Sequence, residues 1–279
     1  MSRKNYLIMA AVAVALLVAF WASGSLLMFF NPLGLLLVLG GTLSAAWVAF
    51  PRTTLLGLWE QMSGLRQAKV LSARQLVELF YQLGRLRRFR GVRHMEELAE
   101  GNDNQFLRMA VAMVADERPA ADIAQRLEQE MDFFLARRES QRAVLSFMGR
   151  LAPAFGLAGT MIGLIRMLHT LSDPTAVASG MSVALLTTFY GLMIANLVVL
   201  PLERKLKEHN RAEAVEMALI TEGAVALAQE TNASAVAARL ASFRYAEEAQ
   251  AAGPRLNIKG ALESLRAVAA GLRKVSDER

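Results

Sequence analysis

The chain has 279 residues, yet it contains no cysteine and only three histidines. The lack of cysteine excludes a disulfide-stapled domain, a thiolate zinc site and a cysteine nucleophile. No G-x-x-x-x-G-K phosphate loop occurs, and His94-Met95-Glu96 stands without the cysteines that a zinc deaminase requires. We therefore expect a protein that is not an enzyme and that holds no metal and no cofactor.

Charged residues are missing from the first part of the chain, where none occurs in the 47 residues between Lys4 and Arg52. One membrane span needs about 20 apolar residues, so this stretch is long enough for two. Asn31-Pro32 predicts a turn near its middle. The pattern predicts spans at residues 6–23 and 33–50. A cleaved signal peptide is a less favoured alternative, because a second apolar segment follows at once.

A second region poor in charge lies further along the chain. It predicts spans at about residues 149–171 and 177–201. The third span reaches membrane thickness if Arg150 and Arg166 lie near the two interfaces and extend their side chains toward water.

The distribution of Lys and Arg predicts the orientation of these spans. The stretch from Arg52 to Arg142 holds 15 of them and the stretch from Arg204 onward holds 12, whereas the loops at 24–31 and 171–178 hold none. By the positive-inside rule, both termini and the middle segment lie in the cytoplasm. The middle segment has 15 basic against 13 acidic residues. This near balance leads us to expect no binding to nucleic acid.

The predicted fold is all-α, a polytopic membrane protein with four transmembrane helices, two of which extend into a cytoplasmic helical domain. Ser72 and Pro119 are each typical of a helix start, and no helix breaker separates Pro119 from the third span. The fourth span continues in the same way to about residue 229. The predicted segments are a first hairpin (1–51), a cytoplasmic helical domain (52–145), a second transmembrane pair (146–202) and C-terminal helices with a tail (203–279).

The four predicted spans contain no Asp and no Glu. An ion relay through a membrane ordinarily uses an intramembrane carboxylate, which this chain cannot supply. The spans do contain other polar side chains, namely Thr42, Ser44, Thr160, Ser182, Thr187, Thr188, Tyr190 and Asn196.

Small residues follow one face of each of the last two spans and predict close helix packing. In the third span they are Pro153, Gly156, Thr160 and Gly163, with the motif Gly159-x-x-x-Gly163, and in the fourth they are Gly180, Ala184, Thr188, Gly191 and Ala195. The threonines have two interpretations, a hydrogen bond within their own helix or a polar contact across it, and the first is favoured. Pro153 and Pro201 each free a carbonyl four residues earlier, which predicts a kink and a helix end.

Three stretches carry a family resemblance. They are FNPLGLLLVLGGTLSAAWVAFP (30–51), LAPAFGLAGTMIGLIRMLHTLSDP (151–174) and GMSVALLTTFYGLMIANLVVLPLERKLK (180–207). These stretches resemble the last three spans of MotA-type flagellar stator proteins, which belong to the MotA/TolQ/ExbB ion-channel family. The resemblance runs from about residue 6 to about residue 243, and the tail lies outside it.

The resemblance implies a stator subunit of the bacterial flagellar motor, in the inner membrane, that couples ion flow to torque. Such proteins form a ring, expected to hold five copies, around two copies of a MotB-type partner. The single span of that partner supplies the ion-carrying Asp. The transported ion is expected to be a proton or sodium, and the sequence does not distinguish the two.

The resemblance also implies roles for individual residues. Thr160, Thr187 and Thr188 are expected on the ion path, and Pro153 and Pro201 in coupling ion passage to movement. Spacing places Gly156, Gly159, Gly163 and Gly191 in helix packing. Arg88 and Glu96 match positions that meet charged residues of the rotor protein FliG. For this short stretch the alternative is a solvated helix end or an anchor to anionic membrane lipid.

Two other functions stay open. One is a non-flagellar motor subunit of the ExbB/TolQ type that energises a periplasmic partner, and the other is a passive membrane scaffold. Four spans with both termini inside favour the flagellar stator, since the ExbB/TolQ group usually has three spans and an outside N-terminus.

Overall fold

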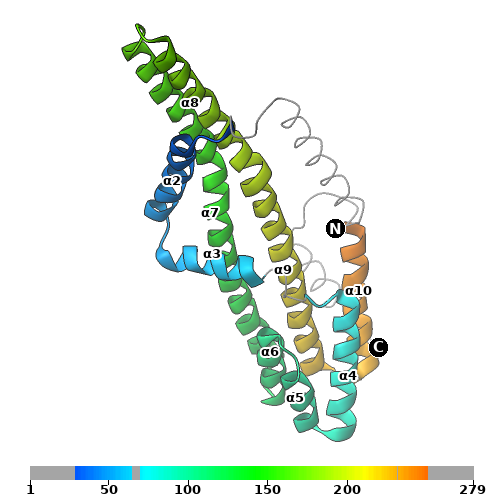
Figure 1. The fold of residues 1–279 in the computed structure, drawn as a ribbon. Helices are drawn as coiled ribbons and strands as arrows, with labels where there is room; N and C mark the ends of the chain where they lie inside the picture. The colour runs from blue at the N-terminus through cyan, green and yellow to red at the C-terminus, as the bar shows by residue number, and fades with distance from the viewer. Residues whose placement is uncertain (1–28, 65–69, 231, 251–279) are drawn as a thin grey trace. The chain divides into compact units, whose positions relative to one another are not determined.

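A computed structural model describes residues 29–64, 70–230 and 232–250, and every regular element within these ranges is helical (Figure 1). The predicted all-α fold is therefore confirmed for the described part. The first predicted span (6–23) and the tail after residue 250 lie outside the described residues.

Three of the described helical stretches are long and apolar enough to cross a membrane. The first is α2 (Pro32–Ala49), and the second is α7 (Ala120–His169), which is 50 residues long. The third is a continuous stretch of 56 residues from Pro174 to Gln229. It comprises α8 (Pro174–Met193), the π-helix η2 (Ile194–Val199) and α9 (Leu200–Gln229). Both long helices continue beyond their apolar parts, as the sequence predicts.

The chain divides into two compact units. The first, here called the membrane unit, contains residues 1–68 and 133–212, and the second, here called the helical unit, contains residues 69–132 and 213–279. Because α7 and α9 each contribute residues to both units, these boundaries differ from the segments that hydropathy defines.

Helix α2 starts at the predicted Asn31-Pro32 turn. The Asn31 side chain accepts a hydrogen bond from the backbone N–H of Gly34 at 2.9 Å, and Pro32 occupies the first helical position. An N-cap followed by proline is a favoured helix start, because proline has no N–H to leave unsatisfied. The helix ends at Phe50-Pro51, and the short helix α3 (Arg52–Gly64) follows.

The membrane unit has an apolar cluster of its own at the start of α9. Its buried members are Leu58, Val144, Leu145, Val199 and Leu206. An ion pair between Arg142 on α7 and Glu203 on α9 lies beside it. The two helices are thereby joined by apolar packing and by a charge pair.

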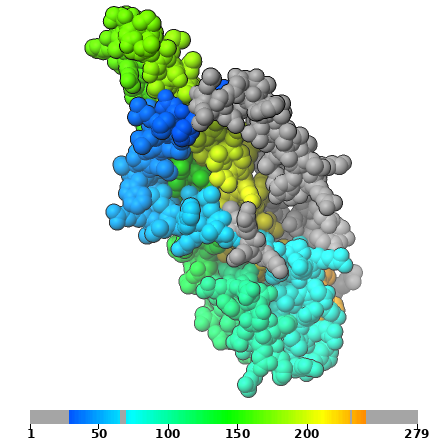
Figure 2. All heavy atoms as spheres, viewed as in Figure 1, coloured from blue at the N-terminus to red at the C-terminus, as the bar shows by residue number. Residues whose placement is uncertain are grey.

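The helical unit contains α4 (Ala73–Arg90), α5 (Val92–Glu100), α6 (Gln105–Ala115) and α10 (Ala233–Gln250), together with parts of α7 and α9. Ser72 forms a capping box with Gln75 at the start of α4, as its position predicts. Phe80 is fully buried, and a Cβ added to Gly223 would lie 2.6 Å from its ring, so α4 and α9 are in close contact. The atoms of α4 to α6 form a continuous surface in Figure 2, coloured cyan to green.

Candidate functional site

Helices α7 and α8 approach each other closely along their small residues. A Cβ added to Gly163 would lie 2.8 Å from the backbone nitrogen of Ala184, and one added to Gly191 would lie 2.6 Å from the carbonyl oxygen of Ala152. A Cβ added to Gly156 would lie similarly close, 2.9 Å from the carbonyl oxygen of Thr187. Such distances to backbone atoms leave no room for a side chain. These glycines therefore set the spacing of the two helices.

Thr187 lies where α2, α7 and α8 meet. It is fully buried, and its hydroxyl donates to the carbonyl of Ala184 on its own helix at 3.0 Å. Its methyl group lies 2.9 Å from the position of a Cβ added to Gly34 on α2, and its Cβ lies 2.5 Å from one added to Gly159 on α7. Thr188, on the predicted small-residue face, also lies at the contact with α7, because its Cα is 3.1 Å from the position of a Cβ added to Gly156.

Thr160 and Thr188 are both half-buried, unlike Thr187. The Thr160 hydroxyl donates to the carbonyl of Leu157 at 2.6 Å, and the Thr188 hydroxyl donates across the helix pair to the carbonyl of Gly156 at 3.4 Å. A hydroxyl that donates its proton still has lone pairs with which it can accept a hydrogen bond or coordinate a cation. Two partly accessible oxygen ligands are thus available on α7 and α8.

The two predicted coupling prolines lie in different backbone environments. Pro153 is inside α7, and its Cα lies 3.1 Å from the position of a Cβ added to Gly191. Pro201 is the second residue of α9, directly after the π-helix η2, and the helix continues through it. Of the two expectations, a helix end at Pro201 does not occur, and the continuation of the fourth span to Gln229 does. Proline has no N–H to donate to the carbonyl four residues earlier. In a π-helical turn the hydrogen bonds join residues five apart, so the missing donor does not interrupt the helix.

Tyr190 links α8 to the start of α2, which the sequence did not predict. Its hydroxyl accepts a hydrogen bond from the backbone N–H of Asn31 at 2.7 Å and donates one to the carbonyl of Phe29 at 2.5 Å. The side chain is only 9% exposed. A buried phenol usually needs such partners, but nothing in the sequence indicates which backbone groups supply them.

Arg88 and Glu96 lie on consecutive helices of the helical unit. Arg88 is exposed in the last turn of α4, and Glu96 is half-buried on α5. Gly91, between the helices, has φ of +86°, a conformation that favours glycine. The stretch that resembles the rotor-contact segment therefore forms a sharp helix–helix corner.

Glu216 on α9 is a buried carboxylate of the helical unit. It accepts hydrogen bonds from the backbone N–H of Leu71 at 3.2 Å and from the Asn104 side chain at 2.9 Å. Burial raises the pKa of Glu216, and the nearby Glu213 raises it further, whereas the two hydrogen bonds act in the opposite direction. One side chain thus joins α9 to the starts of α4 and α6.

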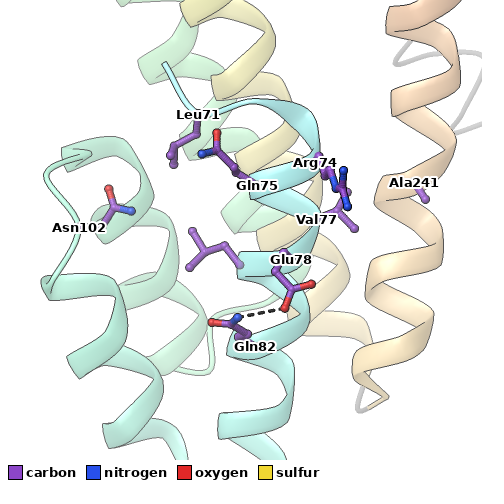
Figure 3. A pocket seen from close by; sticks show the side chains of 9 residues that line it. Leu71, Arg74, Gln75, Val77, Glu78, Gln82, Asn102 and Ala241 are labelled. Atoms are coloured by element: carbon purple, nitrogen blue, oxygen red, sulfur yellow. Dashed lines mark hydrogen bonds between the residues drawn. The ribbon is translucent and has the colours of Figure 1, made fainter. Parts of the chain in front are cut away.

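A groove of about 640 Å³ runs along α4, with Asn102 and Ala241 at its sides (Figure 3). Glu78 and Gln82, which line it, are hydrogen-bonded to each other at 3.0 Å. The described residues contain no group of three or more metal-ligating side chains.

Comparison with known proteins identifies the family. The model of the MotA/TolQ/ExbB proton channel family matches residues 98–218. Motility protein A of Aquifex aeolicus is 31% identical over 204 residues, which cover 71% of this chain and 79% of the relative. The chain belongs to the MotA/TolQ/ExbB proton channel family. Motility protein A of Treponema pallidum is 28% identical over 220 residues, covering 79% of this chain and 85% of that protein.

A solved structure has the same fold as this family member. The Campylobacter jejuni MotAB structure matches with a TM-score of 0.77 over 87% of this chain and 96% of the other, at 21% identity. The resemblance to MotA-type stator proteins is thereby confirmed. Together with the apolar helices, family membership makes this chain a multi-pass inner-membrane protein.

Proposed function

We propose that the chain is the ion-conducting subunit of a flagellar stator, which couples the flow of protons or sodium ions to torque on the rotor. One observation carries this proposal. The helix pair α7 and α8 has partly accessible threonine hydroxyls, but the predicted spans contain no carboxylate. Hydroxyls can pass an ion along but rarely bind and release it by themselves. The relatives named Motility protein A favour this function over the ExbB/TolQ-type alternative and over a passive scaffold.

The missing carboxylate is supplied, in this proposal, by a MotB-type partner with a single span. Five copies of the chain surround two copies of that partner, with both termini in the cytoplasm and lipid around the ring. Of the three threonines expected on the ion path, Thr160 and Thr188 face the ion, and the buried Thr187 supports them from behind. Pro153 and Pro201 couple ion passage to helix movement, and the chain itself catalyses no reaction and binds no nucleic acid.

The rotor contact is assigned to Arg88 and Glu96, which meet charged residues of a FliG-type rotor protein. Their support is the match of residues 88–96 to the family segment and the exposure of Arg88 at a helix corner.

Reconstitution in liposomes tests the partner requirement. The purified chain alone is expected to conduct no ions, and the chain with its partner is expected to conduct. The complex with a partner whose intramembrane Asp is replaced by Asn serves as the matched control and should conduct no ions. A pH-sensitive and a sodium-sensitive dye, used in parallel, identify the ion. Steady conduction by the chain alone would contradict the proposal.

A further inference from the structure

Phe89 stands out in the helical unit because its ring is 73% exposed to solvent. Of the side chains that the structure describes in this unit, it is the one large hydrophobic group that is exposed. The neighbouring apolar residues of α4, by contrast, are buried or half-buried, with Phe80 and Leu83 fully so. A single exposed hydrophobic side chain is ordinary on a protein surface, so the case for a contact depends on the residues that surround this ring and on how it is held.

Basic residues surround Phe89. The stretch from Arg85 to Glu97 contains five arginines and two glutamates. Arg85, Arg88 and Arg90 have no carboxylate partner in the part of the chain that the structure describes. The guanidinium of Arg88 lies over the Phe89 ring, 5.7 Å from its centre. The surface therefore combines an aromatic ring with unpaired positive charge, a combination enriched in the energetic centres of protein interfaces.

The backbone that carries Phe89 is held in place from both sides. Arg87 donates a hydrogen bond to the carbonyl of Leu227 on α9, and Gly91 fixes the sharp turn into α5. A Cβ added to Gly84, one turn earlier, would lie 3.1 Å from Ala233 on α10. Such anchoring presents the ring without a further loss of backbone entropy on binding.

We propose that Phe89 is an apolar anchor of the rotor contact, inserted into an apolar pocket on an acidic surface of the rotor protein. This inference rests on the proposed function and extends it, because it adds an apolar element to a contact otherwise assigned to charges. The positive surface fits an acidic protein partner, and Arg88 contributes both its own charge and a stacked position on the ring. Exclusion of water from the pocket strengthens the neighbouring charge pairs.

The occupancy of flagellar motors by the fluorescently tagged chain tests this proposal in a strain that lacks the native copy. Occupancy is measured as the expression level rises. For Phe89→Ala, the expression level that gives half occupancy is expected to rise about tenfold or more. Phe89→Trp should remain close to the native chain. Phe133→Ala is the matched control, since Phe133 is 72% exposed but belongs to the membrane unit, and it should have no effect.

A second comparison distinguishes a direct contact of Phe89 with the partner from an indirect role in which the Phe89 ring only positions the Arg88 side chain. If Phe89 inserts into the partner, Phe89→Ala should weaken occupancy further in an Arg88→Ala background. No additional effect in that background would overturn the anchor. A photo-crosslinking amino acid at position 89 should capture the rotor protein, and capture of lipid or of a second copy of this chain would overturn it as well.

The outcome also distinguishes this inference from the proposed function. Reduced occupancy in Arg88→Ala with normal occupancy in Phe89→Ala would overturn the anchor alone and leave the charged rotor contact in place. Normal occupancy in both variants would overturn the anchor together with the rotor contact.

Discussion

Three threonines on α7 and α8 share the same chemistry but differ in exposure. Thr187 is fully buried at a three-helix contact, whereas Thr160 and Thr188 are half-buried. Replacement by valine keeps the shape of the side chain and removes the hydroxyl, so it tests the oxygen ligand by itself.

We expect Thr160→Val and Thr188→Val to reduce ion flux about five- to hundredfold, because an ion that loses a ligand faces a barrier higher by ~1–3 kcal/mol. Thr187→Val keeps its methyl contact and loses one hydrogen bond within α8, so it should cost about 1 kcal/mol or less in stability and little in flux. Swimming speed measured against ion-motive force checks this, with ring assembly followed by cross-linking. Near-normal speed in the first two variants would assign both threonines to helix packing.

Glu216 predicts a pH dependence of the helical unit. Burial raises the pKa of this carboxyl in the folded chain above its ordinary value of 4.5. The folded state then holds the proton more tightly than the unfolded state, so the contribution of Glu216 to stability is greatest below its ordinary pKa and falls as pH rises through the folded pKa. Glu216→Gln retains a carbonyl oxygen for Leu71 and Asn104 but cannot ionise.

The Glu216→Gln variant is therefore expected to unfold at a higher temperature than the native chain at pH 8 and to lose most of this difference below the ordinary glutamate pKa of 4.5. Thermal unfolding of the purified protein across pH measures this, with the exposed Glu97→Gln as the control. An equal pH dependence in the Glu216→Gln and native chains would mean that another group sets it.

At the scale of the helices, the contact between α7 and α8 depends on the absence of side chains. The Cβ of Gly191→Ala would meet a backbone carbonyl at 2.6 Å, and a backbone atom in a helix cannot move aside. We expect this change to destabilise the protein by about 1–3 kcal/mol. Gly40→Ala on α2 is the control, because no atom lies within 4 Å of its added Cβ. Thermal stability of the detergent-solubilised protein compares the two, and equal values would contradict close packing at Gly191.

The sequence was most informative about the helices and least about the contacts between them. Asn31-Pro32 predicts the start of α2, and Ser72 predicts the start of α4. Both predictions succeed because capping depends on residues that are adjacent in the sequence. Helical spacing placed Thr188 on the face toward α7, but it did not indicate that Thr187 would be fully buried, because that burial also depends on the packing of α2.

The Tyr190 and Glu216 hydrogen bonds join segments more than 100 residues apart, and no local pattern indicates them. The π-helix before Pro201 was likewise not predicted. A proline indicates a missing hydrogen bond, but the sequence does not reveal how the backbone will compensate.

At the scale of the whole molecule, the residues proposed for the ion path and those proposed for the rotor contact belong to different compact units. Arg88→Glu and Glu96→Lys should therefore abolish or strongly reduce motility while membrane insertion, ring assembly and ion conduction remain. Arg88 is exposed, and exposed charges contribute only ~0–1 kcal/mol to folding, so its loss of motility reflects contact and not unfolding. For the half-buried Glu96, thermal stability of the purified variant makes the same distinction. Motility on soft agar, with cross-linking of the ring, measures this. Normal swimming of both variants would remove the assignment of these residues to the rotor.

The π-helix at Ile194–Val199 sets the rotational phase of the part of α9 that follows it within the membrane unit. A π-turn holds about one residue more than an α-turn, whereas each added α-helical residue turns a helix by about 100°. The π-turn therefore absorbs one extra residue with little change in phase. Deleting one residue, such as the exposed Val198, should leave an ordinary α-helix with Glu203 and Leu206 near their native positions. Inserting one residue should instead rotate Glu203 away from Arg142 and Leu206 out of its apolar cluster, so this segment should tolerate a shortening by one residue better than a lengthening by one.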